Sequence, residues 1–346
     1  MRQFLFILGA IAVLFVLNLV LPALVNPYIF QILILCGINI ILAVSLNLVN
    51  GHTGQFSIGH AGFMAIGGYT CAALTYYLGP QIVERATSIG LPPAVSGITF
   101  FVFSLLAGGA ASAVAGFLVG LPSLRLRGDY LAIVTLGFGE IIRVMILNVE
   151  AVGGARGFAD IPGHTNFFWV SFFVFLTILV VRNLTTSTHG RAFISVREDE
   201  IAAEALGINT TNYKVLAFVI GAFFAGVAGG LFGHYLMYLH TNSFTFMKSF
   251  EVVIMVVLGG MGSITGSVIA ATLLTVLPEA LRPVKEFRMV IYAALLIFLM
   301  IVRPQGLLGM KELSLRTFRS LPFRTEKSKS RQGESGAAEG TNKNAD

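Results

Sequence analysis

Side chains that commonly carry chemistry are few in this sequence, and their spacing does not suit catalysis or metal binding. Of the six histidines, no two have the i, i+4 spacing of a helical zinc site. His60 and His234 lie in apolar stretches, where hydrogen bonding between helices is favoured over contact with a substrate. The chain has no Walker-type phosphate loop, no G-x-S-x-G motif and no convergent pair of carboxylates. We therefore expect no enzymatic activity, no metal and no cofactor.

Ionisable residues inside apolar stretches are candidates for function by default. Glu140 and Arg143 are three residues apart, so they share a helix face and are expected to neutralise each other. Glu251 and Glu279 lie at the ends of apolar runs and are expected at the membrane interface. None of these residues predicts the unpaired acid at mid-depth that an ion-coupled carrier requires.

A polar loop between Arg182 and Tyr213 separates two apolar runs and carries the signals of a short helix. Ser195 and Glu198 have the spacing of a capping box. In this motif the serine hydroxyl bonds a backbone amide of the first helical turn, and the glutamate side chain bonds the backbone amide of the serine. Small apolar residues follow, and Gly207 is the expected stop. The pattern predicts a helix at about 195–208 that is suited to docking against another protein.

Two further segments, one in each half of the chain, are apolar but interrupted by glycine. They are Gly51–Gly62 and Gly259–Gly266. Such a pair points to a transport path between inverted repeats. Close helix packing is the alternative interpretation for each segment taken alone. The candidate lining residues, called the path residues below, are Gln55, Ser57, His60, Gly259, Gly260, Gly262, Ser263 and Thr265.

The elements that must position these residues are membrane-spanning helices. The 346-residue chain is 55% hydrophobic and 12% charged, whereas a soluble domain is about 25% charged. Its apolar runs are continuous and approach the ~20 residues that cross a bilayer. The sequence predicts an all-α, polytopic membrane protein with eight to ten spans and inverted repeats. The runs are residues 4–25, 28–50, 55–78, 92–120, 130–147, 166–181, 214–237, 252–277 and 288–302.

Charge outside these runs predicts the topology. The net charge of +6 comes from basic residues in loops and in the tail, as the positive-inside rule describes, and does not indicate nucleic-acid binding. The loop at 182–213 and the tail are expected inside, together with the N-terminus, and the loops at 149–165 and 239–249 outside. An even number of crossings after residue 213 requires that 252–277 form two half-length helices, broken at 258–263.

Four blocks of the sequence resemble a known family, the permease subunits of bacterial branched-chain amino acid ABC importers, of the LivM type. The resemblance implies a permease domain at 28–310, after an N-terminal span at 1–27 and before a basic cytoplasmic tail at 311–346, which is expected to be disordered. The blocks are residues 51–63, 121–140, 190–208 and 258–266.

The same family implies a role for the polar loop. ABC importer permeases carry an E-A-A-x-x-x-G loop that docks into the ATPase, and Ala202, Ala203 and Gly207 match its later positions. The glutamate is displaced, so that either Glu200 or Glu204 is expected to meet the ATPase. The residues that the resemblance assigns to ATPase coupling, called the coupling residues below, are Arg191, Arg197, Glu200, Ala202, Ala203, Glu204 and Gly207.

The resemblance also implies partners and a mechanism. The partners are a second permease of the LivH type, two cytoplasmic ATPases and a periplasmic binding protein, all at the bacterial inner membrane. The coupling helix is expected to be rigidly continuous with the spans at 166–181 and 214–237, so that closure of the ATPases switches the permease pair between outward-open and inward-open states. Substrate would then pass between the two permeases along the glycine-broken segments. Backbone amides at the breaks, with Gln55, Ser57, Ser263 and Thr265, are expected to hydrate a zwitterion there.

Three alternatives remain open from the sequence. An importer of urea or short amides has a very similar permease, because selectivity rests largely with the binding protein. An ion-coupled secondary carrier requires unpaired acids at mid-depth. A passive channel has no need of a docking helix.

Overall fold

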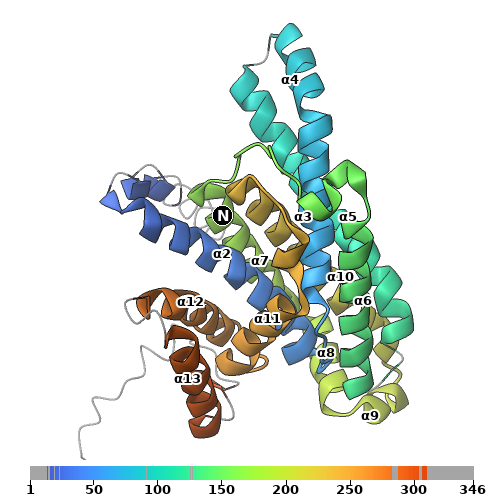
Figure 1. The fold of residues 1–346 in the computed structure, drawn as a ribbon. Coiled ribbons are helices and arrows are strands. Elements are labelled where there is room, and N and C mark those ends of the chain that lie inside the picture. Colours follow the sequence, from blue (N-terminus) through green and yellow to red (C-terminus); the bar gives the residue numbers. More distant parts are fainter. Residues whose placement is uncertain are drawn as a thin grey trace, which may run out of the picture. The chain divides into compact units, whose positions relative to one another are not determined.

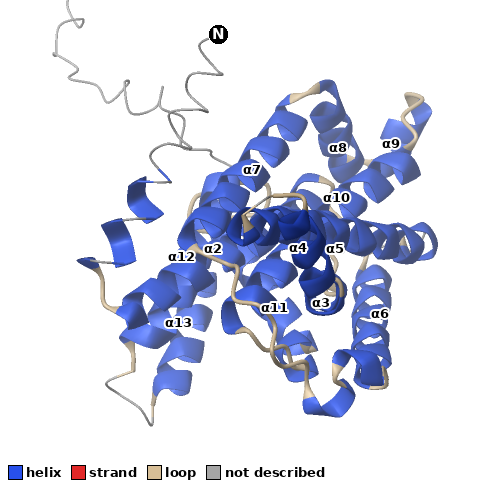
Figure 2. Cartoon of the chain, turned by 90° about the horizontal axis from the view of Figure 1, so that it is seen from above, coloured by secondary structure: helices blue, strands red, loops and turns tan. Residues whose placement is uncertain are grey.

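The computed structural model describes residues 14, 16–18, 20–22, 24–90, 92–124, 126, 128–282, 287–303 and 306–309. This part of the chain consists of helices joined by short loops, with no β-strand (Figure 1, Figure 2). The all-α prediction is confirmed. The α-helices are α2 Pro27–Asn47, α3 His60–Tyr77, α4 Gly79–Ser88, α5 Pro93–Ser123, α6 Asp129–Leu147, α7 Phe167–Thr186, α8 Thr188–Glu198, α9 Glu200–Ala205, α10 Thr210–Leu236, α11 Phe246–Gly259, α12 Ile264–Ala280 and α13 Arg288–Val302. The other helical turns are η1 Leu48–His52, η2 Glu150–Val152, η3 Gly154–Arg156 and η4 Thr241–Phe244.

Within the described residues, six helical stretches are long and apolar enough to cross a membrane. They are α2 with η1, α5, α6, α7, α10, and η4 with α11; α12 is a shorter apolar helix. The protein is therefore a multi-pass membrane protein. The tail at 311–346 and most of the run at 4–25 lie outside the described residues. The exposed helix α4 was not predicted, because its sequence is polar and short.

The centre of the molecule is a close contact of α10 with α3 and α5. A Cβ atom at Gly67 of α3 would overlap the backbone of Gly226 of α10. Ser112 of α5 donates a hydrogen bond to the Phe63 carbonyl of α3, at 2.8 Å. Lipid tails are as apolar as the side chains, so close backbone packing and hydrogen bonds between helices provide much of the association energy.

Two breaks interrupt the helical backbone. After α2 the chain forms the π-helical turn η1 and then runs without helix to His60. Between α11 and α12, Gly260 and Gly262 have φ angles of 105° and 89°, which favour glycine. The break predicted at 258–263 is therefore confirmed. The prediction that both helices are half-length is wrong, because η4 with α11 is long enough to cross a membrane and α12 has 17 residues.

Two loops that the charge pattern predicts on the same side of the membrane are in contact. Phe158 and Leu239 exchange two backbone hydrogen bonds of 2.7 and 2.9 Å, so the two loops expected outside lie together. Leu307 donates to the Leu258 carbonyl at 2.7 Å, which joins the start of the C-terminal region to the end of α11.

The central helix contact gives a stability prediction. We expect Gly67→Ala to lower the melting temperature of the purified protein, because its methyl group would overlap the Gly226 backbone and overpacking costs about 1–3 kcal/mol. Gly137→Ala in α6 is the matched control, since no atom lies within 4 Å of a Cβ placed there. Equal melting temperatures for the two variants would contradict the packing of α3 on α10.

Candidate functional site

The polar loop folds as two helices, α8 and α9, with a break at Asp199. Asp199 has extended backbone angles, and its Oδ1 accepts hydrogen bonds from the amides of Ile201 and Ala202 at 2.9 and 3.0 Å. Ser195 lies inside α8 and donates to the Arg191 carbonyl at 2.9 Å. The predicted capping box at Ser195 is therefore wrong. An aspartate is a strong N-cap, and here it begins the shorter helix Glu200–Ala205 within the predicted range of 195–208.

The end of α9 follows the prediction. Gly207 has a φ of 83°, which suits the left-handed conformation that closes a helix. Its amide donates to the Glu204 carbonyl at 2.9 Å, and the next amide, of Ile208, donates to the Ala203 carbonyl at 3.0 Å. Asn209 then caps α10.

The expected rigid continuity between the coupling helix and the flanking spans is wrong. The backbone leaves the helical conformation at Ser187 between α7 and α8, and again at Asp199 between α8 and α9. A third break precedes α10. α8 and α9 are therefore separate helices, each interrupted from its neighbours along the chain.

Short α9 is held on α10 by its own acidic side chains. Glu200 forms an ion pair with Lys214, with Oε1 and Nζ 2.5 Å apart, and the Lys214 side chain is only 2% exposed. Glu204 accepts a hydrogen bond from the Thr210 hydroxyl at 2.7 Å. Ala203 is buried. Both glutamates proposed to meet the ATPase therefore have a partner within the chain.

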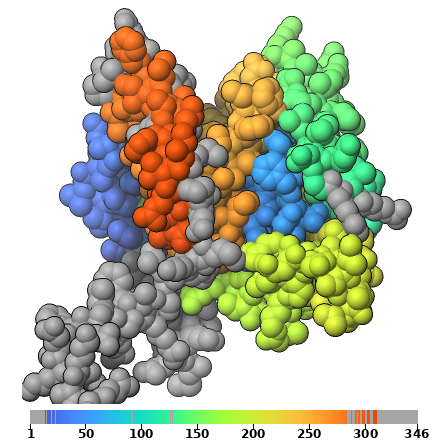
Figure 3. Space-filling model, turned by 90° about the horizontal axis from the view of Figure 1, so that it is seen from below, coloured from blue at the N-terminus to red at the C-terminus, as the bar shows by residue number. Residues whose placement is uncertain are grey.

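The outward face of α9 is apolar. Ile201 is 66% exposed and Leu206 is 81% exposed, with Ala202 and Ala205 between them also exposed. Figure 3 shows α8 and α9, in yellow-green, at the surface of the face seen from below. Exposed apolar side chains that adjoin one another mark interaction surfaces. The sequence predicted a docking helix, but it did not show that Ile201 and Leu206, rather than Ala203, face outward.

Arg197, at the end of α8, connects this loop to the first glycine-broken segment. Its Nη1 donates to the Gly51 carbonyl of η1 at 3.1 Å, and its Nη2 lies 2.5 Å from Glu198. The Arg197 side chain is 19% exposed. Arg191, the other basic coupling residue, is exposed.

The two glycine-broken segments are in direct contact, and Asn47 joins them. Its Oδ1 accepts from the Gly262 amide at 2.9 Å, and its Nδ2 donates to the Ser263 carbonyl at 3.0 Å. A Cβ atom at Gly51 would overlap both Asn47 and the Gly262 amide nitrogen. Non-helical backbone among membrane helices requires such partners. We call this contact the junction. The sequence did not predict a role for Asn47. The one feature that could have indicated it is the presence of a polar residue near the end of an apolar run.

The path residues gather around the junction but are mostly buried. Gln55 Oε1 is buried and has no hydrogen-bond partner among the described residues. The His60 ring lies 2.9 Å from the Ser45 hydroxyl of α2, so the helix-bridging interpretation of His60 is confirmed. The path residues that are buried are Gln55, Ser57, His60, Gly259, Gly260 and Ser263, whereas Gly262 and Thr265 are partly exposed.

An open cavity of about 1040 Å³ lies beside the junction. Arg197 and Glu198 line it together with Gly51 and Gly54 of the first break and Met261 of the second. None of the path residues is part of its wall.

The remaining chemistry candidates have structural partners. Arg143 Nε lies 2.7 Å from Glu140 Oε2, which confirms the predicted pair. Glu140 Oε1 also accepts from the Phe246 amide. His234 Nε2 lies 2.8 Å from the Thr75 hydroxyl, again between helices. In the described ranges, no three His, Cys, Asp or Glu side chains are placed to hold a metal ion.

Membrane-crossing helices, two glycine-broken segments in contact and a capped surface loop joined to them define a polytopic permease. Residues 28–302 match the family described as branched-chain amino acid transport system / permease component. The chain belongs to this family.

Individual relatives agree with the family match. The LivM permease protein of Salmonella typhimurium is 40% identical over 314 residues, covering 81% of this chain and 69% of its own. The LivM protein of Escherichia coli is 39% identical over 338 residues, covering 88% and 75%. The LivH permease protein of Salmonella typhimurium is 37% identical over 167 residues, covering 47% and 53%. No solved structure matches the chain.

The junction gives a second prediction. Asn47→Leu removes both hydrogen bonds that join the two breaks and leaves the Gly262 amide and the Ser263 carbonyl without this partner. We expect a loss of about 1–3 kcal/mol of stability, seen as a lower melting temperature in detergent. Asn148→Leu is the control, because the Asn148 side chain is exposed and bonds only within its own helix. An unchanged melting temperature for Asn47→Leu would show that the junction does not stabilise the fold.

Proposed function

We propose that this chain is one permease subunit of an ATP-driven importer of branched-chain amino acids in a bacterial inner membrane. Its partners are a second, LivH-like permease, two cytoplasmic ATPases and a periplasmic binding protein. The chain's termini face the cytoplasm, and the chain itself is not an enzyme. Support for the cargo comes from the relatives, which are named as permeases of high-affinity branched-chain amino acid transport systems.

One observation carries the mechanism, namely the hydrogen bond from Arg197 to the Gly51 carbonyl. It joins the loop that resembles an ATPase-docking segment to the place where both glycine-broken segments meet. A movement of α8 therefore changes the surroundings of the junction directly. No continuous helix between the docking face and the spans is needed.

The residues of α9 and its C-cap Leu206 divide into two groups in this mechanism. The outward face of α9, with Ile201, Ala202 and Leu206, contacts the ATPase. Glu200, Glu204 and the buried Ala203 fix α9 on α10, so that force applied to the docking face reaches that span.

In the inward-open state the two breaks separate from each other, and the path residues lie at the place where they separate. Backbone amides at Gly260 and Gly262, with the Gln55 amide group, then become available to a passing zwitterion. Gln55 Oε1 supports this, because it is buried without a hydrogen-bond partner in the part of the chain that the structure describes and would gain one when the junction opens.

Replacement of exposed apolar residues of α9 by glutamate tests whether the ATPases dock there. We expect Ile201→Glu and Leu206→Glu each to reduce co-purification of the ATPases at least tenfold, because a carboxylate buried in an apolar contact costs several kcal/mol. Ile89→Glu is the control, since Ile89 is 80% exposed at the end of α4, far from α9 in Figure 1. ATPase recovery that is equal in all three variants would exclude α9 as the docking site.

Coupling through Arg197 is tested in proteoliposomes that contain the full complex. We expect Arg197→Ala to keep the ATPases bound but to lower leucine uptake per ATP hydrolysed about tenfold, because the link to Gly51 is lost. Arg182→Ala, at an exposed position of α7, is the control and should transport normally.

Two results would overturn the proposal. Leucine uptake that continues without ATPases and follows a proton or sodium gradient would identify a secondary carrier. Uptake of urea but not leucine would identify the other cargo.

A further inference from the structure

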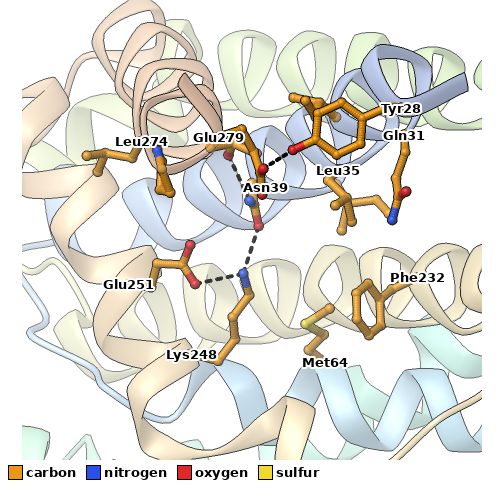
Figure 4. A pocket seen from close by; sticks show the side chains of 14 residues that line it. Tyr28, Gln31, Leu35, Asn39, Met64, Phe232, Lys248, Glu251, Leu274 and Glu279 are labelled. Atoms are coloured by element: carbon orange, nitrogen blue, oxygen red, sulfur yellow. Dashed lines mark hydrogen bonds and ion pairs between the residues drawn. The ribbon is translucent and has the colours of Figure 1, made fainter. Parts of the chain in front are cut away.

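A second cavity, of about 320 Å³, lies apart from the junction, among α2, α11 and α12 (Figure 4). It is smaller than the cavity beside Arg197 and falls within the size range of small-molecule sites. Met64 of α3 and Phe232 of α10 also contribute to its wall.

An ion pair and an amide form a connected polar cluster in the wall of this cavity. Lys248 Nζ donates to Glu251 Oε2 at 2.9 Å and to Asn39 Oδ1 at 3.0 Å. Asn39 in turn donates to the Thr275 hydroxyl of α12 at 2.8 Å. The Lys248 side chain is 21% exposed and that of Glu251 is 36% exposed, so both charges remain accessible from the cavity.

The polar groups lie along the middle of a membrane helix. Asn39 lies 12 residues after Pro27, the first residue of α2, which is about 18 Å along the helix axis. Glu251, which the sequence placed at the interface, is therefore at membrane depth. Glu279 does lie near the interface, because it bonds the Tyr28 hydroxyl at the start of α2. Charges at membrane depth are costly and commonly mark a substrate pathway.

Most of the rest of the wall is apolar, although Tyr28, Gln31, Thr275 and Glu279 also contribute to it. Aliphatic and aromatic side chains lie beside the ion pair, and they suit a branched hydrocarbon group. These wall residues are Ile32, Leu35, Ile38, Met64, Phe232 and Leu274.

We propose that this cavity binds a zwitterionic α-amino acid with an aliphatic side chain during transport. Lys248 binds the carboxylate, Glu251 and Asn39 Oδ1 bind the ammonium group, and the apolar wall holds the side chain. The ion pair is neutral overall, so its two charges match the two charges of a zwitterion. Urea carries no charges for this pair to recognise. Glu279 also lines the cavity, where it accepts a hydrogen bond from the Tyr28 hydroxyl. The proposal rests on the proposed import function and extends it to a substrate site within this chain.

A purely structural ion pair would not need a cavity, and the chain contains such a pair for comparison. Glu140 and Arg143 have the same i, i+3 spacing and similar exposure, but they line none of the cavities described above. Arg143→Gln therefore serves as the matched control for Lys248→Gln.

The first experiment measures ATP-driven leucine uptake by the reconstituted complex at saturating, leucine-loaded binding protein. We expect Lys248→Gln and Glu251→Gln to lower the uptake rate about tenfold or more, because a charge-assisted hydrogen bond to substrate is lost. Lys248→Arg should retain more activity, and Arg143→Gln should transport like the wild type. Normal uptake by Lys248→Gln would overturn the binding site alone, whereas no leucine uptake by the wild type would overturn the proposed function.

The second experiment detects binding without transport. Gln31 is exposed and lines the cavity, so Gln31→Cys introduces a thiol at its wall, while the natural Cys36 and Cys71 are buried. Leucine should slow modification of this thiol by a small thiol reagent in the purified complex. Urea and 4-methylpentanoate, which lacks the amino group, should not. Protection should be lost when Lys248→Gln is added.

Both outcomes of the labelling experiment are informative. Protection by leucine but not by 4-methylpentanoate shows that the cavity binds the amino acid through its charged groups, and loss of protection in Lys248→Gln but not in Arg143→Gln assigns that binding to this ion pair. Equal modification rates with and without leucine, or protection by urea, would overturn the site.

Discussion

The contact between the two glycine-broken segments is the constraint on which the rest of the structure depends. Backbone that leaves the helix among membrane spans must find hydrogen-bond partners in protein, because lipid offers none. Here the Asn47 side chain supplies a donor and an acceptor to the second break, and Gly51 is small enough to allow the approach. From the surface loop, the guanidinium of Arg197 also reaches this place.

The central helices allow this geometry because their own contact is so close. Glycines on α3 and α10 bring backbone against backbone, and serine on α5 adds a hydrogen bond. These helices form a frame against which α2 and α11 pack, and α12 packs on α2 and α11. The first break ends at His60, where α3 of the frame begins, and the second break follows α11.

The sequence predicted the elements better than their contacts. Continuous apolar runs identified the spans, and the glycines at 259–262 located the break that divides 252–277. The prediction of a capping box at Ser195 was wrong because two residues that can cap a helix, Ser195 and Asp199, lie four positions apart. The structure uses Asp199 as the N-cap. Asn47 and Lys248 were missed because a single polar residue in an apolar run does not reveal its partner. Asn47 is 215 residues from Gly262, and no local pattern records such a distance.

The non-helical residues at both ends of α8 have a consequence for its orientation. Because the helix is interrupted at Ser187 and again at Asp199, the direction of α8 is not dictated by that of α7 or α9. Side-chain contacts, such as that of Arg197 with Gly51, set this direction instead. A substitution in these side chains can therefore re-aim α8 without altering either neighbouring helix.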